Sequence, residues 1–199
     1  MKKIAVLVSG GGTNLQAILD AEKSGIIKSA KVVTVISDSE GAFALTRAEK
    51  AGVEAVCIPK KSADFEARLI GLLDEKNVDL IVLAGFLSIL SSEFTRHFEG
   101  KIINIHPSLI PSFCGKGFYG LRVHQAALAR GVKLTGATVH YVNEIPDGGR
   151  IIAQKAVKVL PGDTPEALQQ RVMKEAEHVI LPRAIEYICS ADAAESEGR

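Results

Sequence analysis

The sequence predicts an α/β fold: a doubly wound, Rossmann-like, mostly parallel sheet that ends in an antiparallel C-terminal hairpin and a C-terminal helix. Over the first 105 residues, five short apolar runs alternate with four segments of helical period. Near-continuous apolar runs are typical of strands buried on both faces, and repeated strand–helix–strand units build a parallel sheet through right-handed crossovers. After residue 105, two β-branched runs joined by a glycine-containing turn indicate an antiparallel hairpin.

The elements of the first part of the chain follow from the spacing of their apolar residues. Strands are expected at 4–8, 31–36, 54–58, 80–83 and 102–105. Helices are expected between them, at 15–23, 42–51, 63–76 and 91–98. The strand runs are four to six residues long, which is the common length of strands in globular proteins.

The second part of the chain begins with a loop rich in proline and glycine at 106–120. A helix is expected at 121–130, because its apolar residues return to helical spacing. Two strands, 135–142 and 151–159, follow it and are joined by a turn at 143–149. Sequence neighbours of this kind pair as an antiparallel hairpin.

The last helix has a clear start. Thr164 is expected as its N-cap and Pro165 as its first helical residue, where a proline loses no helical hydrogen bond. A break or kink is expected at Pro182, because proline lacks the N–H that continues a helix. We expect a single domain over residues 1–190 and a frayed tail over 191–199, which are small and polar.

Composition excludes several classes of partner. The chain has 199 residues, with 24 Lys and Arg against 23 Asp and Glu, and so carries a net charge of only +1. This balance argues against a nucleic-acid-binding protein, which needs a basic surface for phosphates. The longest apolar run, 80–87, is far shorter than the roughly 20 residues that span a membrane. We therefore expect small-molecule substrates, no nucleic acid and no membrane, and either a monomer or a homodimer.

Cysteine usage and the N-terminus bear on the compartment. The three cysteines, Cys57, Cys114 and Cys189, are odd in number, widely spaced and without a C-x-x-C pair. They are interpreted as thiols of a reducing compartment. The apolar stretch at 4–8 is too short for the core of a secretory signal. The expected location is the cytoplasm.

A glycine-rich loop directly follows the first expected strand and leads into the first expected helix. It contains Gly12, Thr13 and Asn14. Glycines let backbone N–H groups approach a ligand, and a helix N-terminus favours an anion, so the loop suits a phosphate. The alternative is a tight turn without a ligand. A nicotinamide cofactor is disfavoured because the third glycine of its binding fingerprint is missing. Asp38, after the second expected strand, stands where an acidic residue could hold the ribose of such a cofactor.

A second group lies at the end of the fifth expected strand. Asn104 and His106 are two residues apart, so in an extended segment they point to the same side. An amide donor beside a titratable imidazole suits a reaction that forms and collapses an oxyanion. The alternative is that both side chains only bond to the backbone at the strand end.

Asp147 lies in the hairpin connection, where Asp-Gly is in itself an ordinary turn signal. If the fold brings Asp147 beside His106, the carboxylate is expected to stabilise the imidazolium and raise the pKa of His106. Cys114 is a weaker candidate nucleophile, because no activating base is evident. No metal site is expected, because His106, His124, His140 and Cys114 lack the spacing of metal ligands.

These motifs together resemble one family. The segments 9–14, 83–87, 104–111 and 147–149, in this order and spacing, resemble the folate-dependent formyltransferases. The glycine-rich loop resembles that of the phosphoribosylglycinamide formyltransferases, and the resemblance extends from residue 3 to about residue 188. It implies transfer of a formyl group from 10-formyltetrahydrofolate, as co-substrate, to the amine of 5'-phosphoribosylglycinamide in purine biosynthesis. No metal is implied.

The resemblance also assigns roles to residues. Asn104, His106 and Asp147 match the catalytic residues of the family. The ribonucleotide is expected to be held by Gly12, Thr13, Asn14, Lys174 and Glu177. The folate is expected to contact Leu87, Ser88, Ile89, Leu90, Asn104 and Lys61.

This sequence departs from the family pattern at two basic positions. Ser88 replaces a common arginine, and Ser62 falls where a basic residue is common, with Lys60 and Lys61 beside it. Two alternative functions remain at this stage. One is a hydrolase that cleaves 10-formyltetrahydrofolate, and the other is a nucleotide-binding module without catalysis.

Overall fold

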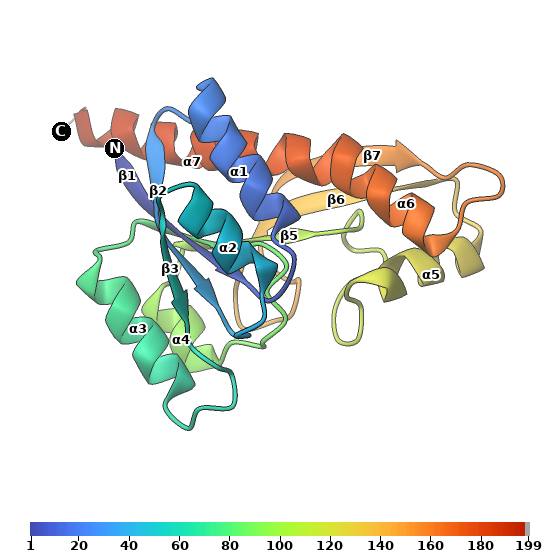
Figure 1. The fold of residues 1–199 in the computed structure, drawn as a ribbon. Helices are drawn as coiled ribbons and strands as arrows, with labels where there is room; N and C mark the ends of the chain where they lie inside the picture. The colour runs from blue at the N-terminus through green and yellow to red at the C-terminus, as the bar shows by residue number, and fades with distance from the viewer. Residues whose placement is uncertain (198–199) are drawn as a thin grey trace.

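The computed structural model describes the backbone of residues 1–197 and the side chains of residues 1–190. Its centre is a seven-stranded sheet in the order β3-β2-β1-β4-β5-β6-β7 (Figure 1). The strands are β1 Lys2–Val8, β2 Ala30–Ser37, β3 Glu54–Cys57, β4 Leu80–Leu83, β5 Ile102–His106, β6 Leu134–Tyr141 and β7 Ile151–Lys158. Every expected strand is present, with its ends within two residues of the expectation.

The sheet is parallel from β3 to β5 and antiparallel from β5 through β6 to β7. Strand order reverses between β1 and β4, which both pair with parallel neighbours. In doubly wound sheets, ligands bind beyond the carboxyl ends of the strands at such a reversal. The predicted fold class, including the C-terminal hairpin, is confirmed.

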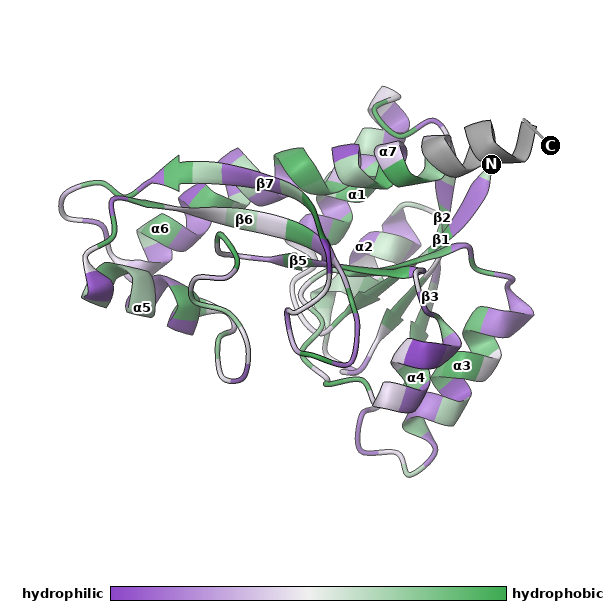
Figure 2. Cartoon of the chain, turned by 180° about the vertical axis from the view of Figure 1, so that it is seen from behind, coloured by the Kyte–Doolittle hydropathy of each residue, from purple (hydrophilic) through white to green (hydrophobic). Residues whose placement is uncertain are grey.

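Helices cover both faces of the sheet (Figure 1). The helices between strands are α1 Thr13–Ser24, α2 Phe43–Lys50, α3 Phe65–Glu75, α4 Ser92–His97 and α5 Leu121–Arg130. Along β1, Ile4, Val6 and Val8 belong to the core under α1, α2 and α7, whereas Ala5 and Leu7 belong to the core under α3 and α4. This alternation explains why the run is continuously apolar. In Figure 2, α3 carries purple and green segments, as expected for a helix with one buried face.

The C-terminal helical segment starts as expected and continues differently. Thr164 is the N-cap of α6 Pro165–Val172, and its side chain accepts a hydrogen bond from the N–H of Ala167. A π-helical turn, η1 Met173–Glu177, follows and leads directly into α7 His178–Glu197.

Of the expected break or kink at Pro182, a break is wrong, because Pro182 lies inside α7. A proline clashes with the carbonyl four residues before it, which here belongs to His178, the first residue after the π turn. The π turn ends directly before His178, and the helical segment passes Pro182 without ending. The expected frayed tail, 191–199, lies outside the residues whose side chains are described. Among the residues whose backbone is described, no helix is both long and apolar enough to cross a membrane.

Candidate active site

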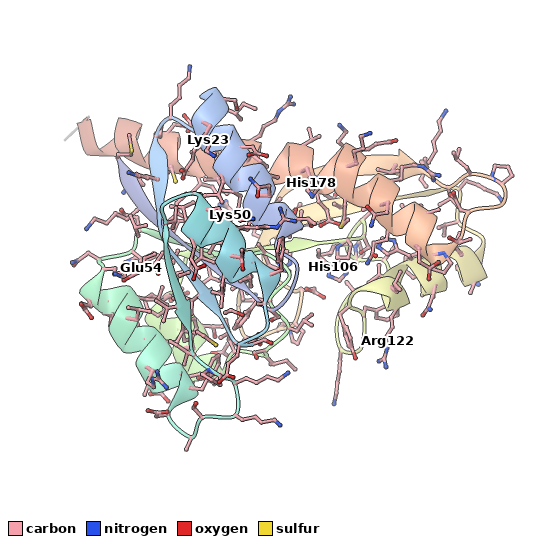
Figure 3. The ribbon with its side chains drawn as sticks, viewed as in Figure 1. Lys23, Lys50, Glu54, His106, Arg122 and His178 are labelled. Carbon is pink, nitrogen blue, oxygen red and sulfur yellow. The ribbon has the colours of Figure 1, made fainter. Side chains whose placement is uncertain are left out.

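The residues singled out in the sequence gather at the carboxyl ends of the central strands. The glycine-rich loop follows β1, and Asn104 and His106 are at the end of β5. Asp147 comes from the connection between β6 and β7. His106 lies at the end of β5 in Figure 3. This is the edge of the sheet where a ligand site is expected.

The fold brings Asp147 next to His106. Its Oδ2 lies 3.5 Å from Nδ1 of His106, and the two side chains are 15% and 6% exposed. Asp147 has a φ of 55°, a left-handed backbone conformation that asparagine, aspartate and glycine adopt most readily. The hairpin turn therefore has a second role besides closing the hairpin, which is to place a carboxylate beside a buried imidazole.

His140 is a further member of the site that the sequence did not reveal. It lies directly opposite Asn104 in the pairing of β5 with β6, and its Nε2 is 3.1 Å from Asn104 Nδ2. Its Nδ1 lies 2.8 Å from the carbonyl oxygen of Tyr141, so Nδ1 donates and Nε2 accepts from the Asn104 amide. Nε2 is also 3.6 Å from Asp147 Oδ1. His140 thus orients the Asn104 amide, a contact that only the register of β6 could disclose.

Backbone groups of the loop before α5 form hydrogen bonds with both His106 and Asp147. The carbonyl oxygen of Phe113 lies 3.0 Å from His106 Nε2, and the N–H of Gly115 donates to Asp147 Oδ2 over 2.7 Å. Both ring nitrogens of His106 therefore face acceptors, which is the arrangement that an imidazolium needs. Phe113 has a φ of 50°, so this loop takes an unusual backbone path to reach the site.

The pKa values in this group are set by a balance of burial and charge. Burial lowers the pKa of His106 below its ordinary value, and this effect outweighs the opposite effects of Asp147 and the Phe113 carbonyl. Asp147 acts in the expected direction, but the net shift of the His106 pKa is downward and not upward, because the side chain is only 6% exposed. For Asp147, burial acts to raise the pKa. Contacts with His140, His106 and the Gly115 N–H outweigh burial, so its pKa is lowered.

His124, from α5, is a buried neighbour of this group. It has no exposed surface, and neither ring nitrogen has a hydrogen-bond partner among the described residues. Burial and then the nearby His106 lower the pKa of His124 to about 4, so it is neutral at pH 7. Within the described part of the chain, no cluster of three histidine, cysteine, aspartate or glutamate side chains could hold a metal ion.

The glycine-rich loop and the C-terminal helical segment meet at a buried pair. Asn14 Nδ2 donates to Glu177 Oε2 over 2.6 Å, joining the first turn of α1 to the end of the π turn. Thr13 Oγ1 lies 3.7 Å from Met173 Sδ in the same turn. Burial raises the pKa of Glu177 to about 7. Of the expected partners of the loop, Glu177 is therefore adjacent to it, whereas Lys174 is exposed.

The segment expected to contact folate lies beside the start of the glycine-rich loop. The N–H of Leu87 donates to Ser9 Oγ over 2.8 Å, and Ser88 Oγ donates to Asp38 Oδ2 over 2.5 Å. Leu87 and Ile89 are 58% and 84% exposed, so apolar surface is available here. Where an arginine is common, Ser88 instead bonds to a buried aspartate. Lys61 is exposed and lies in the loop between β3 and α3.

Comparisons with known proteins agree with this geometry. The chain is 45% identical over 192 residues to the trifunctional purine biosynthetic protein adenosine-3 of Gallus gallus, covering 94% of this chain and 18% of that protein. It is 44% identical to the phosphoribosylglycinamide formyltransferase of Haemophilus influenzae, covering 94% of this chain and 87% of that one. It thus spans less than a fifth of the avian relative and most of the bacterial one.

A solved structure is similar over nearly the whole fold. The crystal structure of glycinamide ribonucleotide transformylase 1 from Symbiobacterium toebii superposes with a TM-score of 0.88 at 44% identity. The alignment covers 96% of this chain and 89% of that one. The family described as formyl transferase matches residues 2–185. With 184 of 199 residues matched, the chain belongs to the formyl transferase family.

Proposed function

We propose that this protein transfers the formyl group of 10-formyltetrahydrofolate to the primary amine of 5'-phosphoribosylglycinamide, a step of purine biosynthesis. The observation that carries the proposal is the convergence of Asn104, His106 and Asp147 at the end of β5, on the edge of the sheet that also carries the glycine-rich loop. The likeness to the bacterial formyltransferase from Haemophilus influenzae, over 87% of its length, supports the same activity.

The two substrates are assigned to adjoining subsites. The phosphate of the ribonucleotide binds the loop at Gly12 and Thr13, and Asn14, Glu177 and Lys174 contact the rest of the nucleotide. The carboxylate of Glu177 accepts hydrogen bonds from ribose hydroxyls. The folate lies along Leu87, Ser88, Ile89 and Leu90, with Asn104 and Lys61 at its ends. The adjacency of Leu87 and Ser9 supports this arrangement, because it joins the two subsites.

The reaction needs no covalent bond to the protein. The amine nitrogen attacks the formyl carbon, and a tetrahedral intermediate forms with its negative charge on the former carbonyl oxygen. The Asn104 amide and the protonated His106 donate hydrogen bonds to this oxygen, which takes the place of the Phe113 carbonyl at Nε2 of His106. The carbon–nitrogen bond to the folate then breaks, and one proton passes from the attacking nitrogen to the leaving nitrogen. Asp147 orients His106, stabilises its imidazolium form and helps an ordered water carry the proton from the attacking nitrogen to the leaving nitrogen.

The assignment is tested by following tetrahydrofolate formation by absorbance, with and without the ribonucleotide. Turnover that depends on the ribonucleotide is expected, whereas formate release without it would show a hydrolase. Ligand binding without turnover would show a binding module. Asn104→Ala, His106→Ala and Asp147→Asn should each lower kcat by about two to three orders of magnitude.

A histidine–aspartate pair elsewhere in the chain provides the control. His97 Nε2 lies 2.9 Å from Asp74 Oδ2, and both side chains are about half exposed, on α4 and α3. Asp74→Asn and His97→Ala should leave kcat unchanged. Near-normal turnover of Asp147→Asn in a folded protein would contradict the role given to Asp147.

We also propose that residues 1–190 act as a single domain in the cytoplasm, as a monomer or a homodimer. Cys57 and Cys114 are free thiols, which supports a reducing compartment.

A further inference from the structure

We propose that Arg47, on α2, is a positioning residue that sets the glycine-rich loop for binding the phosphate of the ribonucleotide. This inference rests on the function proposed above, because it names what prepares that subsite. Arg47 is outside the loop and was not singled out in the sequence. Its guanidinium Nε donates to the carbonyl oxygen of Gly11 over 2.8 Å.

The start of α2 packs directly on the loop. Gly12 has a φ of 71°, and a Cβ added to it would lie 2.6 Å from Ala44 Cβ and 3.4 Å from Arg47 Cδ. Ala44 has no exposed surface, so this contact cannot relax toward solvent. Gly12 is therefore required for its conformation and also because α2 occupies the space of a side chain.

Two successive carbonyl groups of the loop are tied to α2. The Gly10 carbonyl accepts from the N–H of Ala44 over 3.0 Å, and the Gly11 carbonyl accepts from Arg47. In a planar trans peptide the N–H points opposite to the C=O, so the N–H groups of Gly11 and Gly12 point away from α2. Neither has a hydrogen-bond partner among the residues described. Paired free N–H groups of this kind form an anion-binding concavity.

The guanidinium is itself held in place from several sides. Its Nη1 donates to Gln16 Oε1 in α1 over 3.0 Å, and its carbon lies 5.0 Å from the centre of the Phe43 ring. One planar group thus joins α1, α2 and the loop. Lysine cannot reproduce this arrangement, because its ammonium is a point charge without the fixed fork of arginine.

The expected effect is specific to the phosphorylated substrate. Without Arg47 the Gly11 carbonyl loses its donor and the peptide can rotate, which misdirects the Gly12 N–H. Loss of a charge-assisted hydrogen bond with its partner left unpaired corresponds to about a 10- to 100-fold loss of affinity. The formyl transfer takes place at Asn104, His106 and Asp147, so kcat at saturation should change little.

The test compares Arg47→Ala, Arg47→Lys and the control Lys50→Ala. Lys50 is exposed, at the other end of α2 from the loop, and its removal costs the same charge on the same helix (Figure 3). The substrates are the ribonucleotide and its dephosphorylated form, glycinamide riboside. Arg47→Ala should raise KM for the ribonucleotide about 10-fold or more, whereas kcat/KM for the riboside and KM for the folate should stay within about 2-fold. Arg47→Lys should be intermediate and Lys50→Ala unchanged.

The outcomes separate this inference from the proposed function. Equal KM values for the ribonucleotide in wild type and Arg47→Ala, with wild type active, would overturn the positioning role alone. A parallel loss on the riboside would also overturn it, because it would show a general structural role. Should Arg47→Ala fail to fold, Arg47→Lys gives the same comparison. A wild-type protein that does not turn over the ribonucleotide would refute the proposed function itself.

Discussion

Glu177 gives the sharpest prediction about stability. Its side chain is 6% exposed, and burial raises its pKa from the ordinary 4.5 to about 7, with the Asn14 hydrogen bond opposing this effect. The folded protein therefore holds a proton that the unfolded chain releases near pH 4.5. The stabilisation of the folded state by protonated Glu177 is complete below that pH and is lost as the pH rises through about 7. Glu177→Gln keeps the shape and the acceptor for Asn14 but removes the titration.

The size of the effect follows from the two pKa values. A gap of about two and a half pH units, from 4.5 to about 7, corresponds to about 3 kcal/mol once both states are ionised. At about pH 5.5 the unfolded carboxyl is already ionised, and about 1 kcal/mol of this stabilisation is lost. Between about pH 5.5 and 8.5, the free energy of unfolding of the wild-type protein should therefore fall by about 2 kcal/mol relative to that of Glu177→Gln.

Urea unfolding of wild type, Glu177→Gln and Glu175→Gln at these two pH values measures the difference. Glu175 is exposed in the same π turn, so its substitution removes a carboxylate without touching Asn14. Glu175→Gln is the control for the loss of a carboxylate from this turn. A constant difference between wild type and Glu177→Gln would show that Glu177 titrates as an ordinary carboxyl, and the reasoning from its burial would be refuted.

Three further predictions concern the loop, the imidazole and the core. Gly12→Ala should lower the free energy of unfolding, measured in urea, by at least about 1 kcal/mol, because Gly12 has a left-handed φ and Ala44 packs against it. An unchanged free energy of unfolding would contradict that packing. Asp147→Asn should lower the pKa of His106 further, because a negative charge that raises it is removed; an unchanged NMR titration of the ring would contradict this. Phe94→Ala should cost about 3–5 kcal/mol in thermal unfolding, since Phe94 is fully buried, and a loss below about 1 kcal/mol would contradict its place in the core.

The fold was predictable because its signals are local. The β1 run is apolar throughout because successive residues enter the two cores on opposite faces of the sheet. Thr164 and Pro165 mark a helix start through chemistry that acts within one turn. The placement of Asn104 and the glycine-rich loop at the same edge of the sheet also followed from the sequence, because parallel strands end at one edge.

The remaining features depend on contacts between distant segments. His140 reaches Asn104 only through the register of β6 against β5, and nothing near His140 in the sequence signals that pairing. The Asn14–Glu177 pair joins residues 163 positions apart through a π turn, whose extra residue per turn shifts the faces of a helix. The sequence predicted that Asp147 raises the pKa of His106. It did not show how deeply His106 is buried, and burial lowers the pKa by more than Asp147 raises it.

The lowered pKa of His106 is consistent with the proposed reaction. In the free protein, burial keeps the imidazole less basic, although the Phe113 carbonyl and Asp147 already face its two nitrogens. When negative charge develops on the formyl oxygen, a second anion joins Asp147 beside the ring, and the low local dielectric strengthens its attraction for a proton. The charged form of His106 is then favoured most where the oxyanion exists and least where it does not. In the proposed reaction, burial and Asp147 together would therefore stabilise the transition state more than the bound substrates, which is the condition for raising kcat.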